Sequence, residues 1–264
     1  MIWQDINNIK INSPLVHNIT NYVVMNFSAN ALLALGASPV MAHAVEEVEE
    51  LVVLSGALVI NIGTLSTRWI DAMLLAGRKA NAMGIPIVLD PVGCGATRFR
   101  TTTCLRLIEE TRPTVIRGNA SEIRALNDGE GITKGVDSLH TPDQALDDAR
   151  QLSARTGCVV SVSGSVDLIV EGNRKTVRIA NGHPMMTHVT GMGCTSSAIT
   201  GAFLAVNPSA FEAATNAMAV MGVAGEMATE QSVGPGSLQV HFLDALYRLK
   251  ESDFAQQLKI DYSA

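Results

Sequence analysis

The sequence predicts an α/β fold in which helices cover both faces of a mostly parallel central sheet. Short apolar runs typical of buried strands alternate with longer segments of helical spacing along most of the chain. The runs over 57–63 and 85–91 are almost continuously apolar, as expected of parallel strands buried on both faces. With 264 residues, 47% of them hydrophobic, the chain is long enough for one such three-layer sandwich, and we expect 1–264 to form a single domain.

The first half of the chain alternates regularly between the two kinds of element. We expect helices over 1–10, 21–35, 46–55 and 67–83, one ending near 110 and one beginning at 120, and strands over 13–20, 38–43, 57–63, 85–91 and 114–119. Gly36 and Gly84 end two of the helices, because glycine readily takes the left-handed conformation that follows a helix. The segment 127–140 is interpreted as a loop, and Thr141 and Pro142 as the start of a helix that runs to 156.

The second half predicts strands over 158–164, 167–172 and 175–181, the last two as a hairpin. Strand-like residues then lead into VTGMGCTSSA at 189–198, and Ala-rich helices follow over about 194–206, 209–230 and 237–250. We expect the apolar faces of 21–34 and 209–230 to exceed what one chain needs for its own packing.

Composition restricts the classes of partner. The net charge of −6 without a basic run gives no sign of nucleic-acid binding, and no apolar run is long enough to cross a membrane. The amino terminus lacks the layout of a signal peptide. The four cysteines contain no CxxC pair, so we interpret them as reduced thiols and expect a cytoplasmic protein.

The stretch at 189–198 has the chemistry of an anion site. Gly191 and Gly193 lack a Cβ, so their backbone N–H groups can approach a ligand closely. The first N–H groups of the following helix have no partners within the helix and lie at its positive end, which favours phosphate. Cys194 would stand beside that phosphate, where we expect its thiol to have a lowered pKa and to handle a proton. A tight turn without ligand is the alternative.

Polar residues and glycines lie at or just after the carboxyl ends of the predicted strands. In a mostly parallel sheet, ligands bind at this edge. The residues are His17, Asn18, Asn21, Asn61, Gly63, Asp90, Arg117, Asn119, Ser163 and Gly164. Among them Asp90, together with Glu122 at a helix start, suits Mg²⁺, which is held by few carboxylates, waters and substrate phosphates. Capping roles are the alternatives for both acids, a capping box in the case of Glu122. Arg117 at a strand end suits an anion.

Eight blocks in order carry a family resemblance. They are HNITN (17–21), LGASPVMA (35–42), NIGTL (61–65), DPVGCGATRFR (90–100), IRGNASEI (116–123), VSGSVD (162–167), VTGMGC (189–194) and GPGSLQ (234–239). Together they resemble the hydroxyethylthiazole kinases of the ribokinase-like superfamily, over nearly the whole chain and least in 127–158 and after Leu249. Two departures, Met192 and Cys94, stand where smaller residues are common in the family.

The resemblance implies a transferase of thiamine biosynthesis that uses ATP and Mg²⁺ to phosphorylate 4-methyl-5-(2-hydroxyethyl)thiazole. It assigns Asn21, Val23, Met41 and Gly191 to the thiazole pocket, Arg117 and Ser163 to nucleotide binding, Asp90 and Glu122 to the metal, and Cys194, with Gly191 and Gly193, to catalysis. Cys194 stands where most ribokinase-like kinases carry aspartate. The resemblance also implies a homotrimer with the substrate site between subunits.

Two other functions remain open from the sequence. One is a ribokinase-like kinase of a related heterocyclic alcohol, of hydroxymethylpyrimidine or pyridoxal type, against which GMGC in place of GxGD argues. The other is a hydrolase that uses Cys194 as a nucleophile. It needs a histidine base, and only His188 is near in sequence.

Overall fold

Most of the sheet is built from the short apolar runs that the sequence indicated. The computed structural model describes residues 2–129, 142–173 and 175–262. The strands are β1 (Leu15–Ile19), β2 (Ser38–Val40), β3 (Ala57–Asn61), β4 (Ile87–Asp90), β5 (Val115–Asn119), β6 (Val159–Ser163), β7 (Asp167–Glu171), β8 (Lys175–Ile179) and β9 (Ile260–Asp261). In the described chain they form one sheet, in the order β2-β1-β3-β4-β5-β6-β7-β8-β9. The pairs from β2 to β6 are parallel and those from β6 to β9 are antiparallel.

Helices connect and cover these strands. They are α1 (Ile2–Asn12), α2 (Met25–Leu35), α3 (Val48–Leu54), α4 (Thr67–Met83), α5 (Arg98–Thr111), α6 (Ala120–Asp128), α7 (Pro142–Thr156), the 3₁₀ helix η1 (Pro184–His188), α8 (Met192–Leu204), α9 (Ala210–Glu230), α10 (Pro235–Arg248) and α11 (Glu251–Gln257). The predicted helix over 67–83 has the same ends as α4 because Ser66 caps its start and Gly84 ends it in the left-handed conformation.

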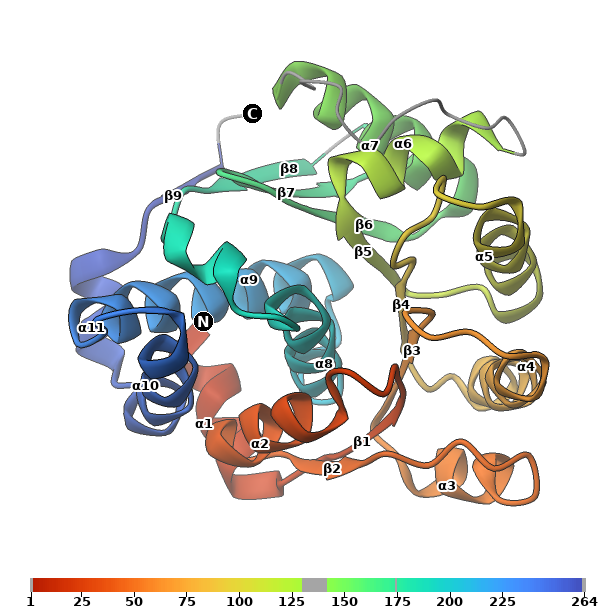
Figure 1. Ribbon diagram of the computed structural model, residues 1–264, viewed down its shortest axis with the longest axis horizontal. Helices are drawn as coiled ribbons and strands as arrows, with labels where there is room; N and C mark the ends of the chain where they lie inside the picture. Colours follow the sequence, from red (N-terminus) through yellow and green to blue (C-terminus); the bar gives the residue numbers. More distant parts are fainter. Residues whose placement is uncertain (1, 130–141, 174, 263–264) are drawn as a thin grey trace.

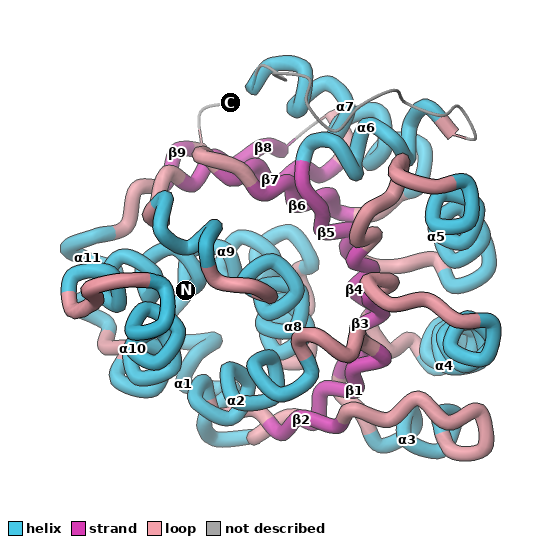
Figure 2. Tube along the Cα trace, in the orientation of Figure 1, coloured by secondary structure: helices cyan, strands magenta, loops and turns pink. Residues whose placement is uncertain are grey.

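The helices form two layers, one on each face of the curved sheet (Figures 1 and 2). On one face, α3 to α7 cover a core that includes Met73, Leu107 and Leu152. On the other, α1, α2 and α8 to α11 enclose a core that includes Leu32 and Phe203. The predicted three-layer α/β sandwich with a mostly parallel sheet is therefore confirmed.

Helix α8 lies directly against the centre of the sheet. A Cβ on Gly201 would come within 2.7 Å of Val59 Cγ2 and 3.0 Å of Val16 Cγ1, so only glycine permits this approach to β1 and β3. The close packing brings the first turn of α8 to the carboxyl ends of β1, β3 and β4, where parallel α/β sheets bind ligands.

Several sequence predictions differ from the structure. The residues before the Gly-x-Gly turn form η1 rather than a strand, because Pro184 starts a helical turn and His183 Nδ1 accepts a hydrogen bond from Met185 N–H. Helix α8 begins at Met192 rather than 194, and α11 and β9 were not predicted. The loop predicted over 127–140 falls mainly on residues outside those described, as does the predicted cap Thr141, although α6 continues to Asp128.

The helix predicted over 209–230 was expected to carry more apolar surface than one chain needs for its own packing, and it does not. Helix α9 is buried within the chain's own helical layer along most of its length, so its apolar surface is used inside one protomer. All four cysteines are free thiols, as predicted. Across the described ranges, every helix is too short or too polar to span a bilayer.

Candidate active site

A buried group of amide and carboxylate side chains lies where β1, β3 and β4 end, beside the first turn of α8. Asn61 is its centre, because its Nδ2 donates to Asp90 Oδ2 at 2.8 Å and its Oδ1 accepts from Asn21 Nδ2 at 2.8 Å. Ser197 Oγ donates to the same oxygen of Asp90 at 2.7 Å. The Asp90 carboxylate can only accept, so it fixes the orientation of the Asn61 amide, which in turn fixes that of Asn21. Because the sequence predicts a catalytic role for Cys194, we call Asn21, Asn61, Asp90 and Cys194 the catalytic corner.

Cys194 joins this corner at the start of α8. Asn21 Nδ2 lies 3.4 Å from Cys194 Sγ and donates a hydrogen bond to it. Burial, and after it the negative charge of Asp90, raises the pKa of the Cys194 thiol to about 11. The lowered pKa expected for this thiol is therefore wrong, since removal from water and the Asp90 carboxylate outweigh the hydrogen bonds from Asn61 and Asn21 and the charge of Arg117. The thiol is protonated at neutral pH.

The two glycines of the turn are needed for different reasons. Gly191 has a φ of +89°, and a Cβ there would lie 2.7 Å from Val24 Cγ1. A Cβ on Gly193 would lie 2.8 Å from Arg117 Nη1, so glycine leaves room for the guanidinium. The first intrahelical bond of α8 runs from Thr195 N–H to Gly191 O, so the N–H groups of Met192, Gly193 and Cys194 precede the helix ladder. These N–H groups lie beside Arg117, at the place where the sequence predicts an anion site.

The two acids assigned to the metal have different surroundings. Burial raises the pKa of Asp90 to about 6, Arg117 opposes that shift and Glu122 adds to it, so the two carboxylates are near enough to repel. Glu122 forms the capping box that was its alternative interpretation, since its Oε2 accepts from Asn119 N–H at 2.8 Å. Its Oε1 accepts from Gly93 N–H at 2.8 Å and holds the loop after β4.

This donor set fits Mg²⁺ in kind. Asp90 and Glu122 offer hard oxygen atoms at the edge of the anion site, and their mutual repulsion would be relieved by a cation. The described residues include no group of three or more His, Cys, Asp or Glu side chains placed to hold a metal. Two carboxylates still suit Mg²⁺, because this ion keeps several waters and takes further oxygens from substrate phosphates.

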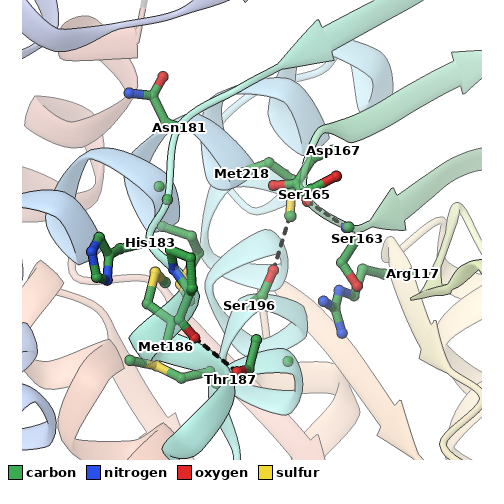
Figure 3. A pocket seen from close by; sticks show the side chains of 17 residues that line it. Arg117, Ser163, Ser165, Asp167, Asn181, His183, Met186, Thr187, Ser196 and Met218 are labelled. Atoms are coloured by element: carbon green, nitrogen blue, oxygen red, sulfur yellow. Dashed lines mark hydrogen bonds between the residues drawn. The ribbon is translucent and has the colours of Figure 1, made fainter. Parts of the chain in front are cut away.

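A pocket of about 400 Å³ lies on the other side of the first turn of α8. Figure 3 shows Arg117 and Ser163 on one side of it, and His183 and Met186 across from them. It is lined by Arg117, Ser163, Gly164, Ser165, Asp167, Asn181, Gly182, His183, Pro184, Met186, Thr187, Met192, Gly193, Ser196, Met218, Met221 and Gly222. Arg117 Nε is buried without a hydrogen-bond partner in the described chain, so its guanidinium retains a free donor.

Among the residues assigned to the thiazole pocket, Asn21 belongs to the corner and Val23 follows it in the turn before α2. Asn21 is 3% exposed, whereas Val23, two residues later, is 66% exposed and Tyr22 is 64% exposed. Asn21 Oδ1 accepts from Val23 N–H at 3.1 Å and so shapes the turn between β1 and α2. Met41 is half-buried after β2, and His17 Nε2 is hydrogen-bonded to the neighbouring Ala42 O at 2.8 Å. Because Val23 and Tyr22 are exposed, a substrate bound beside Val23 would remain in contact with solvent on one side.

Comparisons with known proteins show which family this chain is similar to. The model of the hydroxyethylthiazole kinase family matches residues 6–252. The chain belongs to this family. Curated relatives named hydroxyethylthiazole kinase include one from Syntrophus aciditrophicus, 59% identical over 98% of this chain and 96% of the relative. One from Leptospira biflexa is 53% identical over 97% of this chain and 95% of its own length.

Solved structures agree with this family. A hydroxyethylthiazole kinase from Pyrococcus horikoshii is 43% identical with a TM-score of 0.91, and the match covers 100% of this chain and 99% of that one. A ribokinase-like superfamily protein from Enterococcus faecalis is 14% identical with a TM-score of 0.65, over 90% of this chain and 88% of that one, and shows the fold alone. The chain is thus a kinase with the ribokinase-like fold.

The structure brings together more of this kinase's pocket than the sequence indicated. Asp167, Asn181 and Met186 line it and were not assigned a role. Apolar residues at helical spacing, such as Met218 and Met221 in α9, usually pack in a core. Both methionines are indeed buried, yet they form the pocket wall. The GSVD segment after β6 was the one signal in the sequence that pointed to Asp167.

Proposed function

We propose that this member of the hydroxyethylthiazole kinase family transfers the γ-phosphoryl group of ATP to the hydroxyl of 4-methyl-5-(2-hydroxyethyl)thiazole, as in thiamine salvage. The observation that carries the proposal is the placement of the first turn of α8 between two sites, the 400 Å³ pocket and the catalytic corner. The choice of substrate is supported by relatives that are named hydroxyethylthiazole kinase and match this chain over nearly their full length. We further propose that 1–264 act as a single domain in the cytoplasm.

ATP would occupy the pocket with its phosphates toward the start of α8. Arg117 has an unpartnered Nε, and its Nη1 faces Gly193, so the guanidinium can take phosphate oxygens. Ser163 ends β6 on the same wall. The N–H groups of Gly193 and Cys194, which precede the hydrogen-bond ladder of α8, would stabilise the charge on the moving phosphoryl group.

Mg²⁺ bound near Asp90 and Glu122 would neutralise charge on the phosphates, which is the chemistry that it supplies in phosphoryl transfer. Asn61 and Ser197 hold the Asp90 carboxylate in place, each through a hydrogen bond to Oδ2. Glu122 keeps the Gly93 loop next to α6. These contacts would preserve the arrangement of the two acids whether or not the ion is bound.

Cys194 would receive the proton of the substrate hydroxyl. Its minor thiolate form takes that proton late, when the oxygen–phosphorus bond has largely formed, and becomes the thiol. Asn21 holds the sulfur toward the hydroxyl through its Nδ2. The hydrolase alternative is not favoured, because Asn21 rather than a histidine contacts Cys194 and because the raised pKa of Cys194 disfavours a nucleophilic thiolate.

The thiazole ring would lie beside Asn21, Val23, Met41 and Gly191, in a site completed by a second subunit of a homotrimer. The exposure of Val23 and Tyr22 supports this arrangement, because a binding site normally buries most of its ligand. Light scattering should show a trimer, and a fully active monomer would refute the shared site.

The substrate is tested by ADP release from MgATP with and without the thiazole alcohol. We expect strong stimulation by the thiazole, a weaker response to hydroxymethylpyrimidine or pyridoxal, and a phosphate ester of the thiazole by mass spectrometry. Folded protein whose ADP release is unchanged by the thiazole would refute the substrate. A larger response to pyridoxal or the pyrimidine would favour the related kinase.

A further inference from the structure

The wall of the pocket opposite Arg117 is a segment that lacks sheet hydrogen bonds of its own. It runs from Asn181 to Thr187, after the end of β8, and turns at Gly182 with a φ of +124°. Six of its residues line the pocket: Asn181, Gly182, His183, Pro184, Met186 and Thr187. We call 181–187 the wall segment. Its position depends on what holds it from behind.

The wall segment lies directly on α9. A Cβ on Gly222 would come within 2.5 Å of Asn181 Cβ, and a Cβ on Gly225 within 2.3 Å of Met186 Sδ. These two glycines, one turn apart, leave no space for a shift of the segment toward the helix. Motion away from α9, into the pocket, is opposed by hydrogen bonds instead.

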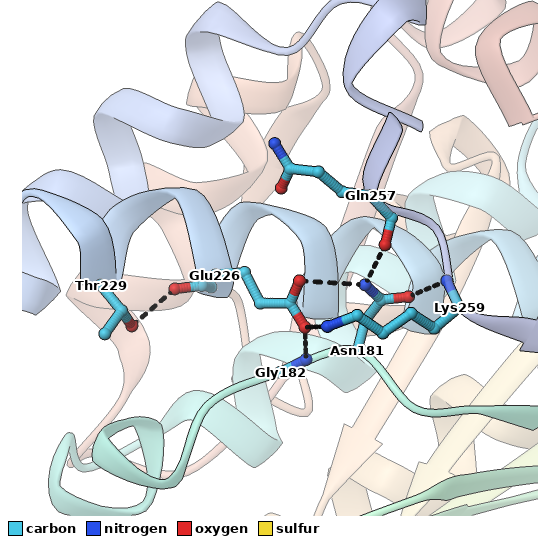
Figure 4. Close-up of polar contacts among 7 residues, drawn as sticks. Asn181, Gly182, Glu226, Thr229, Gln257 and Lys259 are labelled. Carbon is cyan, nitrogen blue, oxygen red and sulfur yellow. Dashed lines mark hydrogen bonds and ion pairs between the residues drawn. The ribbon is translucent and has the colours of Figure 1, made fainter. Parts of the chain in front are cut away.

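Glu226, the next residue of α9, supplies the central hydrogen-bond acceptor (Figure 4). Its Oε1 accepts from Gly182 N–H at 2.9 Å and from Lys259 Nζ at 2.9 Å. Its Oε2 accepts from Asn181 Nδ2 at 3.2 Å. One carboxylate thus joins α9, the wall segment and the carboxyl-terminal segment. The exposed fraction of the Glu226 side chain is 16%, against 57% for Lys259, so the bonds to Asn181 and Gly182 are partly shielded from water whereas the bond to Lys259 is exposed.

Asn181 completes the connection to the carboxyl-terminal segment. Its Nδ2 also donates to Gln257 O at 2.7 Å, and its Oδ1 accepts from Lys259 N–H at 2.7 Å. Ala180 N–H donates to Lys259 O at 2.9 Å. The residues from Gln257 to Lys259 lie beyond the range 6–252 that the family model matches. A part of the chain outside that range therefore supports the pocket.

The electrostatics of Glu226 agree with this geometry. Burial acts to raise its pKa, but hydrogen bonds from Lys259, Gly182 and Asn181, with the charge of Lys259, outweigh burial and lower the pKa. The carboxylate is therefore ionised at neutral pH and can accept from three donors at once.

We propose that Glu226 is a positioning residue that holds the wall segment between α9 and the carboxyl-terminal segment, and thereby sets the affinity of the pocket for ATP. The proposal rests on the nucleotide site proposed above. Glu226 does not line the pocket and acts through Asn181 and Gly182. It should affect nucleotide binding and leave the chemistry at Cys194 unchanged.

Glu226→Gln tests this, because an amide offers one oxygen to three donors and turns an NH₂ group toward one of them. We expect the KM for ATP and the Kd for a non-hydrolysable ATP analogue to rise by about tenfold, the effect of losing one charge-assisted hydrogen bond. The kcat and the KM for the thiazole should stay within about twofold of wild type. Backbone N–H exchange in 182–187 of the ligand-free protein should become faster.

Glu110→Gln is the matched control. Glu110 is also a helical carboxylate, paired with Arg106 and Arg78, but it lies on α5 at the opposite face of the sheet. It should change none of these values. Lys259→Met is a milder variant, which removes one donor to Glu226 but keeps the backbone bond from Lys259 to Asn181. It should shift the Kd in the same direction by a smaller factor.

The outcomes separate this proposal from the proposed function. Wild-type protein that binds the ATP analogue but does not phosphorylate the thiazole would overturn the substrate and leave the role of Glu226 in place. Unchanged Kd and unchanged exchange in both Glu226→Gln and Lys259→Met would overturn the positioning role alone. A fall in kcat without a change in Kd would also overturn it.

Discussion

The catalytic corner and the wall segment lie on opposite sides of the first turn of α8 and are stabilised in different ways. In the corner, side chains bond to side chains: Asn61 joins Asn21 to Asp90, and Asn21 reaches Cys194. The wall segment is held largely through backbone groups, such as Gly182 N–H and Gln257 O. The corner is closed by hydrogen bonds before any ligand binds, whereas Arg117 Nε in the pocket is still without a partner.

This difference has a functional meaning. The groups that we propose to handle a proton are held in one orientation, because each amide of the corner already has a hydrogen-bond partner. The pocket keeps polar donors for a ligand and obtains its shape from contacts behind its wall. Changes in the corner should therefore lower turnover, while changes around the pocket should alter binding or stability.

The largest effect is expected in the corner at Cys194. Cys194→Ala should lower kcat by a factor of about 10²–10⁴, as typical for the loss of a general base. Cys194→Asp should keep or increase kcat, because a carboxylate is ionised at neutral pH and the thiol, with a pKa of about 11, is not. Steady-state kinetics measure both, with Cys158→Ala as a control at a buried thiol that directly precedes β6.

The pH profile sharpens this result. Because the pKa of Cys194 is raised, kcat of the wild type should increase with pH above neutrality, by up to about tenfold per unit. Cys194→Asp should show no such increase over the same range. An Asp variant as inactive as the Ala variant would mean that the sulfur itself is required, and would return the covalent mechanism to consideration.

A smaller effect is expected at Asn61, the centre of the corner. Asn61→Ala removes the bond to Asp90 and leaves Asn21 free to turn away from Cys194. We expect kcat to fall by about ten- to a hundredfold through misplacement of Cys194, with the KM for ATP unchanged. Asn127→Ala, which removes an amide bond to Asp148 O far from the site, is the control. A change in the KM for ATP alone would contradict the separation of corner and pocket.

Next in size is the metal requirement. Glu122→Gln should raise the Mg²⁺ concentration needed for half-maximal rate by about tenfold. The amide keeps one oxygen, so it can accept from Asn119 N–H or from Gly93 N–H but no longer has a carboxylate oxygen for each. The control for the cap is Asp253→Asn, which makes the same change in the carboxylate that accepts from Lys250 N–H on α11. An unchanged Mg²⁺ requirement in Glu122→Gln would leave only the capping role for this residue.

The smallest effect concerns the pocket and the stability of the fold. Burial raises the pKa of Asp167 from 3.8 to about 6, against opposing effects from Gly164 N–H and Arg117. The folded protein then binds more protons than the unfolded chain between about pH 4 and pH 6. Asp167 therefore contributes stability below this window that is lost as pH rises through it, with a slope of at most about 1.4 kcal/mol per pH unit.

Urea unfolding across this window checks the contribution of Asp167. Asp167→Asn keeps an oxygen for Gly164 N–H and removes the titration, so the decrease of stability with rising pH should be shallower than in wild type. The pKa of Asp90 is also raised to about 6, and its titration contributes equally to the pH dependence of stability in wild type and in Asp167→Asn. Identical slopes would contradict the assignment to Asp167.

The sequence by itself determined the elements that carry the site. Continuous apolar runs and glycine stops located the parallel strands and the helix over 67–83, because these features follow from local burial and backbone geometry. Since the carboxyl ends of parallel strands meet at one edge, Asn21, Asn61, Asp90 and Arg117 could be expected together before any contact was known. The resemblance added the activity and the role of Cys194.

Only the tertiary structure decided the electrostatics and the pocket wall. The pKa of Cys194 depends on how deeply the thiol is buried and on its distance from Asp90. The GMGC motif predicts neither of these. The helical spacing of Met218 and Met221 does not distinguish a core residue from one that borders a pocket, since both kinds are apolar and buried. The role of Glu226 depends on backbone groups 44 residues before it and on a lysine 33 residues after it. Backbone atoms are the same in every residue, so a contact made through them leaves no pattern in the sequence.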